Sequence, residues 1–226
     1  MLDEVLLLQL GQVRQTWAKG QLKEAYDRYE VLLEEYPEHP TILREYGHAL
    51  FMEYGDLEKS ALLLERALEQ EPDSIITLQC LCLLYSWGYG HGYAAAGPLY
   101  RRLIALAPTD KQICVNAYLG IGTMRGAPGC SLNPQESRDA FQMATEIDPE
   151  YVNAWLNLTT LCCELRDWPA AQIAATRAEA LCRQQGHSTS YAQKLLDHIN
   201  RQEPLKNRSY YNGTYLNFRW PNIPLE

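Results

Sequence analysis

Apolar and polar residues follow one another along the chain with the period of amphipathic helices, and prolines end these helical stretches at regular intervals. The prolines are Pro37, Pro72, Pro108 and Pro149, spaced by 35, 36 and 41 residues. Proline lacks an N–H and clashes with the preceding turn, so it ends one helix and lets the next begin at a fixed angle. A recurrence of about 34 residues is typical of stacked helical hairpins.

Three further sets of positions stay in register with these prolines. A small residue begins the second helix of each hairpin, a large side chain stands eight residues before each proline, and Leu or Ala stands five before it. Small residues let two helices approach closely, and large ones fill the space beside them. The three register sets are Ala25, Ser60, Ala96 and Ser137; Tyr29, Leu64, Tyr100 and Phe141; and Leu32, Ala67, Leu103 and Ala144.

At these positions the chain resembles the tetratricopeptide repeat (TPR) family, over roughly residues 3 to 183. The clearest matches are AWLNLTTLCCELRDWPAAQIAATRAEAL and LREYGHALFMEYGDLEKSALLLERALEQEPD. The resemblance implies an all-α fold, a right-handed superhelical solenoid of about five TPR helical hairpins plus a C-terminal helix and an irregular aromatic tail.

The repeat register also sets the expected domain boundaries. The solenoid covers residues 1–186, with units at about 3–37, 40–72, 75–108, 111–149 and 152–184. A capping helix at 187–203 is predicted to cover the apolar face of the last repeat, and residues 204–226 form an aromatic, basic tail. Excess length falls between the two helices of a hairpin, most of all in the Gly- and Pro-rich stretch 126–134.

The charge balance narrows the class of partner. Lys and Arg number 20 against 28 Asp and Glu, which gives a net charge of −8 and a pI near 5.2. Broad binding to nucleic acid or to an anionic membrane is therefore not expected, and no apolar run is long enough for a membrane span. The acidic start Met1-Leu2-Asp3-Glu4 does not resemble a secretory signal, and scattered cysteines do not resemble a disulfide framework, so we expect a cytoplasmic protein.

No constellation of residues points to catalysis, to a metal or to another cofactor. The histidines are isolated, and Cys80 and Cys82 would point to different faces of a helix, as would Cys162 and Cys163. Buried apolar cysteines are the favoured interpretation over metal ligands. The Gly-rich stretch 88–92 follows a helix and has no adjacent Lys-Ser/Thr, so a widened turn is favoured over a phosphate loop.

The family resemblance also implies which residues line the concave groove formed by the first helices of the hairpins. The predicted groove residues are Arg44, His48, Phe51, Gln79, Leu83, Gln112, Asn116, Asn153, Asn157 and Thr160. This mixed apolar and amide lining suits an extended peptide, because amides can bond its backbone while apolar pockets take its side chains.

Asn116 and Asn157 hold the same groove position in consecutive units. They resemble part of the asparagine ladder by which some TPR grooves hold a peptide backbone, and the alternative is that each caps a local network. The cationic set by which chaperone-tail TPRs clamp a terminal carboxylate is absent. Only Arg44 offers a cation on this face, so binding of chaperone C-termini is disfavoured.

The tail gathers aromatic residues among basic ones, with a net charge of +2 against −10 for residues 1–203. Its predicted anchors are Tyr211, Tyr215, Phe218 and Trp220. Docking in cis on the solenoid, or in trans with self-association, is favoured over a disordered tail.

These features predict a non-catalytic, chaperone-like scaffold that holds a segment of a protein partner during assembly, secretion or regulation. The alternative is a regulatory or targeting subunit of an enzyme complex, held through its tail and convex face. An enzyme with a site near the loops of units three and four is the least favoured interpretation.

Overall fold

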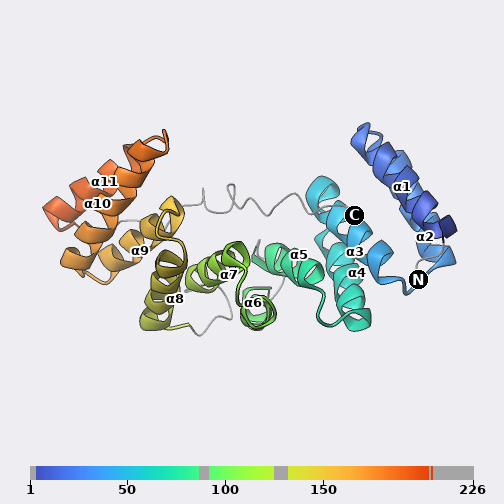
Figure 1. The fold of residues 1–226 in the computed structure, drawn as a ribbon, viewed down its shortest axis with the longest axis horizontal. Coiled ribbons are helices and arrows are strands. Elements are labelled where there is room, and N and C mark those ends of the chain that lie inside the picture. The colour runs from blue at the N-terminus through green and yellow to red at the C-terminus, as the bar shows by residue number, and fades with distance from the viewer. Residues whose placement is uncertain (1–3, 87–91, 125–131, 204, 206–226) are drawn as a thin grey trace. The chain divides into compact units, whose positions relative to one another are not determined.

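A computed structural model describes residues 4–86, 92–124, 132–203 and 205, and helix is the only regular secondary structure among them (Figure 1). The helices are α1 (Glu4–Ala18), α2 (Leu22–Glu35), α3 (Pro40–Ala49), α4 (Leu57–Gln70), α5 (Ile75–Ser86), α6 (Gly92–Leu106), α7 (Lys111–Thr123), α8 (Pro134–Ile147), α9 (Val152–Glu164), α10 (Trp168–Gln184) and α11 (Ser190–Arg201). A π-helical turn, η1 (Leu50–Tyr54), continues α3. The predicted all-α fold is confirmed.

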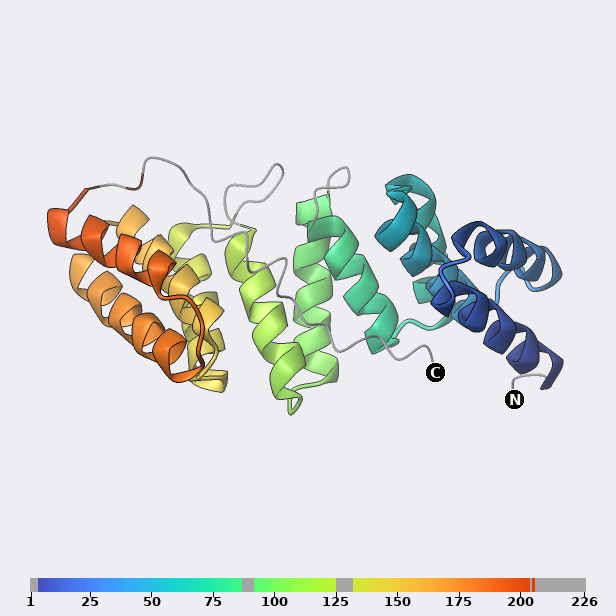
Figure 2. The same cartoon turned by 90° about the horizontal axis from the view of Figure 1, so that it is seen from above.

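The helices form two compact units, the first of α1–α5 and the second of α6–α11. In the first unit α1 pairs with α2 and α3 with α4, while α2 also contacts α3 and α4 contacts α5. In the second unit α7 pairs with α8 and α9 with α10, and α11 packs on α10 and α9 (Figure 2). Each of the four prolines that set the repeat lies between two consecutive helices: Pro37 between α2 and α3, Pro72 between α4 and α5, Pro108 between α6 and α7, and Pro149 between α8 and α9.

The three register sets form the centre of this packing. All twelve residues are buried, and none is more than 3% exposed. Burial of large side chains beside small ones supplies the main favourable free energy of such a stack, since each hairpin alone would leave one apolar face in water. The register in the sequence therefore locates the core of both units.

Glycines in the first helices make room for the large side chains of the second. A Cβ atom on Gly47 of α3 would lie 2.9 Å from Leu64 Cγ of α4. A Cβ atom on Gly122 of α7 would lie 2.4 Å from the ring of Phe141 of α8. No ordinary Cβ contact is that short, so both helix crossings depend on the absence of a side chain.

In both units a buried serine of the second helix bonds a glycine carbonyl of the first helix, but the glycine lies at a different position along that first helix. Ser60 donates a hydrogen bond to the Gly47 carbonyl at 2.7 Å, and Ser137 donates one to the Gly122 carbonyl. Gly47 is the eighth residue of α3, whereas Gly122 is the twelfth of α7. The difference of four residues is about one helical turn, or about 6 Å. Residues i and i+4 share a face, so α7 is displaced along its axis relative to α8 without being rotated.

Acidic or amide side chains begin several of the second helices. Asp56 caps α4 by accepting a hydrogen bond from Lys59 N at 3.1 Å, and Asp167 caps α10. Asn133 and Glu136 form a capping box at the start of α8. These caps satisfy backbone N–H groups that have no partner within the helix, and so fix where each second helix starts.

Candidate binding site

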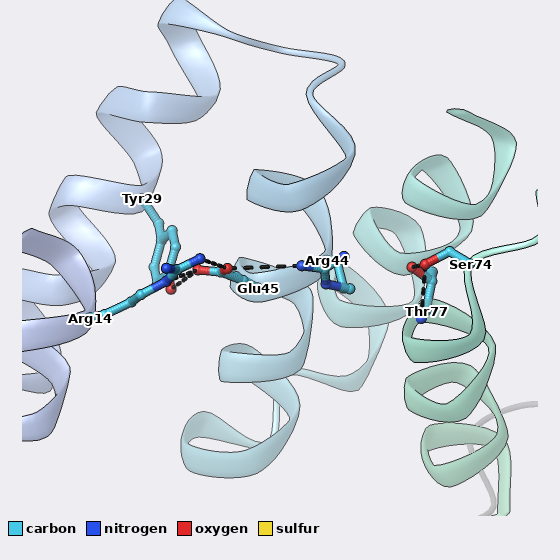
Figure 3. Close-up of polar contacts among 6 residues, drawn as sticks. All are labelled: Arg14, Tyr29, Arg44, Glu45, Ser74 and Thr77. Atoms are coloured by element: carbon cyan, nitrogen blue, oxygen red, sulfur yellow. Dashed lines mark hydrogen bonds and ion pairs between the residues drawn. The ribbon is translucent and has the colours of Figure 1, made fainter. Parts of the chain in front are cut away.

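The first helices of the first unit, α1, α3 and α5, gather polar side chains around a buried carboxylate. Glu45 of α3 is 3% exposed. Arg14 of α1 donates to it through Nη2 at 2.6 Å and Nε at 3.3 Å, and Tyr29 of α2 donates its hydroxyl at 3.3 Å (Figure 3). The hydrogen bond to Glu45 raises the pKa of Arg14, while burial and the same carboxylate raise the pKa of Tyr29. The result is a closed, charge-paired cluster.

Arg44 and His48 lie beside this cluster, one turn apart on α3. The side chain of Arg44 is 12% exposed, and its Nη2 lies 3.9 Å from Glu45 Oε1. That distance allows electrostatic attraction but is too long for a hydrogen bond. Burial, helped by the positive charge of Arg44, lowers the pKa of His48 below its usual value. His48 is therefore neutral at pH 7, and Arg44 carries the positive charge of the pair.

The other predicted groove residues of the first unit are mostly covered. Phe51 and Gln79 are each 7% exposed, and Leu83 is half-buried. At the start of α5 the hydroxyl of Thr77 donates to Ser74 Oγ at 2.9 Å (Figure 3). Arg44 also influences α5, because its charge acts against the burial that raises the pKa of Cys80 to about 12.

In the second unit the predicted residues of α7 form a short amide pair. Gln112 is exposed, and its Nε2 donates to Asn116 Oδ1 at 3.0 Å. Asn116 itself is 1% exposed, and its Nδ2 has no hydrogen-bond partner. One of the amide's two polar ends is thus satisfied by its own helix and the other is not.

The predicted residues of α9 continue this neutral surface. Asn153 is half-buried, and Asn157, one turn further on, is 0% exposed with neither Oδ1 nor Nδ2 hydrogen-bonded. Thr160 is also fully buried, but its hydroxyl donates to the Leu156 carbonyl at 3.0 Å. Asn157 is therefore the one predicted groove residue in the described chain whose side chain is both fully buried and wholly unsatisfied.

A cleft of about 480 Å³ opens next to these residues, between α9, the end of α10 and the start of α11. Asn153 and Leu156 of α9 form one wall, and Tyr191 and Ala192 of α11 form another. Leu205 and Tyr191 pack against the apolar cluster that includes Leu156, so apolar side chains lie beside the polar residues that line the cleft. Such a mixture suits a chain segment better than a charged small molecule.

Sequence reasoning missed part of the first-unit cluster. Arg14 lies in a first helix whose repeat pattern is degenerate, and Tyr29 was recognised only as a core residue. No local signal in the sequence pairs Arg14 with Glu45, because the two are 31 residues apart. The predicted tail anchors Tyr211, Tyr215, Phe218 and Trp220 lie outside the described residues.

The cysteines have the predicted buried character. All six in the described chain are free and buried, and burial raises the pKa of Cys162 to about 11 and of Cys163 to about 12. Within the described ranges no group of three His, Cys, Asp or Glu side chains is placed to hold a metal ion. No described helix is long and apolar enough to cross a bilayer.

The paired helices, the glycine crossings and the buried register sets define an all-helical repeat protein. A family model of the tetratricopeptide repeat matches residues 16–79, which cover α2 to α4 and parts of α1 and α5. Residues 16–79 therefore match the tetratricopeptide-repeat family, and the described chain has the fold of tetratricopeptide-repeat proteins.

Solved TPR structures share the fold at low sequence identity. MamA residues 41 to the end, from Desulfovibrio magneticus RS-1, superposes with a TM-score of 0.70 at 19% identity, over 82% of this chain and 99% of that one. YrrB, described as a TPR protein with an unusual peptide-binding site, superposes with a TM-score of 0.68 at 14% identity, over 84% of this chain and 90% of that one. No curated protein sequence matches the chain.

Proposed function

We propose that the protein is a non-catalytic scaffold that binds an extended segment of a protein partner along the first helices of its hairpins. The second unit supplies the backbone-reading surface, with Asn116 and Asn157 as its central contacts. The partner segment is held during assembly or regulation of a larger complex.

The observation that supports this proposal most directly is the state of Asn157. A fully buried amide without any hydrogen bond costs about 1–3 kcal/mol for each unmade bond, so proteins rarely keep one without a use. An extended peptide offers both an N–H and a C=O at each residue, and so could satisfy both ends of this side chain. Because Asn157 is covered, binding would require side chains around it to move apart.

The neighbours of Asn157 are consistent with such a ligand. Asn116 of α7 has a free Nδ2, while exposed Gln112 and half-buried Asn153 offer further amides one turn away from each. The cleft beside α9 adds an apolar wall for ligand side chains. Amides that bond a backbone, combined with apolar pockets, are the usual means of recognising an extended segment.

The chemistry of the cysteines supports both the non-catalytic role and a cytoplasmic location. Thiols whose pKa is raised by burial are poor nucleophiles at neutral pH. The six cysteines among the described residues are all free, which fits a reducing compartment better than an oxidising one.

The proposal is tested by panning the immobilised full chain against a displayed library of random dodecapeptides. A binding module should enrich related sequences, and a synthetic copy of the best one should bind in solution by fluorescence anisotropy. The double variant Asn116→Leu/Asn157→Leu should weaken that binding at least tenfold, because the apolar side chains cannot bond a peptide backbone.

Asn200→Leu, on an exposed part of α11, is the matched control and should bind as the wild type does. Equal thermal stability or better in the double variant excludes misfolding as the cause of weaker binding. Failure to enrich any sequence would contradict peptide binding, whereas wild-type affinity in a folded double variant would contradict the role of the two asparagines.

A further inference from the structure

Arg44 and His48 are two largely covered donors on the first helices of the first unit, and neither makes a hydrogen bond within the described chain. They are four residues apart on α3, so their side chains share one face of the helix. Arg44 carries five N–H donors, and a neutral His48 carries one more. A guanidinium with 12% exposure has lost most of its water, so the absence of an acceptor is unusual.

The nearby carboxylate does not serve as that acceptor. Glu45 is held from the other side by two nitrogens of Arg14 and by the hydroxyl of Tyr29 (Figure 3). These bonds fix its oxygens 3.9 Å or more from Arg44. The fork of Arg44 therefore remains available, while Glu45 balances Arg14.

The net charge of Arg14, Glu45, Arg44 and His48 indicates which kind of anion Arg44 would bind. Arg14 and Glu45 cancel, and His48 is neutral at pH 7, so one unmatched positive charge remains on Arg44. A planar carboxylate matches both that single charge and the planar guanidinium fork. A doubly charged phosphate would place more negative charge beside the fixed carboxylate of Glu45, and the repulsion would be strong away from bulk water.

We propose that Arg44 and His48 form a subsite that accepts the side-chain carboxylate of an Asp or Glu residue in the bound partner segment. The inference rests on the proposed function, since it assigns one contact of the bound partner, and the subsite lies wholly within the first unit. Arg44 lies on α3, between α1 and α5 of the same unit, so a segment held there continues in both directions. That placement favours a side chain over a chain terminus.

The same dodecapeptide selection tests the subsite when it is run on three forms of the full chain. The wild type and Arg28→Gln should both select peptides with Asp or Glu at one fixed position. Arg28 of α2 is the matched control, because its side chain is 41% exposed and its partners within the described residues are Glu24 and Gln12. Arg44→Gln should select peptides without that acidic preference.

A double-mutant cycle then measures the contact itself. In the best peptide, changing the acidic residue to its amide should weaken binding to the wild type about tenfold and should leave binding to Arg44→Gln unchanged. His48→Gln should give a smaller loss, because it removes one neutral donor. Arg44 makes no hydrogen bond to the rest of the described chain, so its variant should melt within a few degrees of the wild type.

Several results would overturn the subsite. Peptides selected without an acidic position, or an equal loss on amidating the acid in wild type and Arg44→Gln, would remove it while leaving the scaffold proposal in place. A requirement for a free C-terminal carboxylate, found by comparing amidated and free synthetic peptides, would show that the wrong carboxylate had been assigned. Selection of no peptide at all would end both proposals.

Discussion

The two units build the same helical hairpin but place different chemistry on their first helices. In the first unit a buried carboxylate, Glu45, is matched by Arg14 and Tyr29, and a second arginine stands beside them. In the second unit the corresponding surface is neutral, and its central amide, Asn157, has no partner at all. In the first unit the buried carboxylate has its hydrogen bonds made by Arg14 and Tyr29, and Arg44 and His48 lie beside it without one among the described residues, whereas in the second unit the buried amide itself has no hydrogen bond.

The comparison teaches that burial alone does not indicate what a polar residue does. Glu45 and Asn157 are both almost inaccessible, yet removing the partners of Glu45 should destabilise the fold, whereas removing the amide of Asn157 should not. The distinction comes from counting hydrogen-bond partners, and it separates residues that hold a unit together, such as Glu45, from buried polar residues without a partner, such as Asn157.

The largest effect is expected when the charge pair of the first unit is broken. Arg14→Gln leaves Glu45 buried with only a distant cation, and should reduce the free energy of unfolding by about 3 kcal/mol. Urea unfolding measures the loss, and hydrogen exchange should assign it to α1–α5. Arg28→Gln, which removes an exposed pair with Glu24, should change stability by less than about 1 kcal/mol. Equal effects of the two variants would contradict a closed cluster.

The next largest loss of stability is expected in the second unit, when a side chain is added at the glycine where α7 packs against α8. Gly122→Ala puts a methyl group within 2.4 Å of the Phe141 ring and should cost about 1–3 kcal/mol. The matched control is Gly11→Ala in α1, where an added Cβ atom would meet nothing within 4 Å. This substitution should stabilise the helix by up to about 1 kcal/mol, because Ala has the higher helix propensity. Thermal unfolding of both variants checks the sign, and a neutral Gly122→Ala would mean that the crossing is looser than described.

A change of the opposite sign is expected at the open amide. Asn157→Leu removes an unsatisfied buried group at similar volume, and should raise the free energy of unfolding by about 1 kcal/mol while weakening peptide binding. Asn200→Leu on the surface should leave both quantities nearly unchanged. If Asn157→Leu is instead destabilising, the amide has a structural role and the contrast between the units fails.

The smallest expected effect is a pH dependence in the first unit. The pKa of His48 in the folded chain lies below its ordinary value of 6.5, so the unfolded chain binds more protons between the two values. Stability should therefore be complete above pH 6.5 and decline as the pH falls toward the folded pKa. His48→Gln should remove part of that decline relative to the wild type, and part should remain because the pKa of His39 is also lowered, chiefly by burial. Urea midpoints from pH 7.5 to 5.5 would show the difference.

The sequence predicted the fold far better than the polar contacts. Positions such as Tyr29, Ser60 and Phe141 were identifiable because the repeat puts the same kind of side chain at the same distance from each proline. The ion pair of Arg14 and Glu45 joins two hairpins, and a contact between hairpins cannot be predicted from the periodicity within one repeat. Groove positions could be assigned for Asn116 and Asn157, but whether their amides are satisfied depends on every neighbour in three dimensions.

The one-turn displacement of α7 against α8, together with the π-helical turn η1, has a consequence for how such a chain can change length. An insertion normally rotates everything that follows it about the helix axis, by about 100° for each added residue. A π-helical turn accommodates one added residue within the helix. A displacement of four residues along the helix axis returns the side chains to nearly the same face, because four residues make about one turn. The connection between the two helices of a hairpin can therefore lengthen by mutation while the buried face of the first helix keeps its orientation.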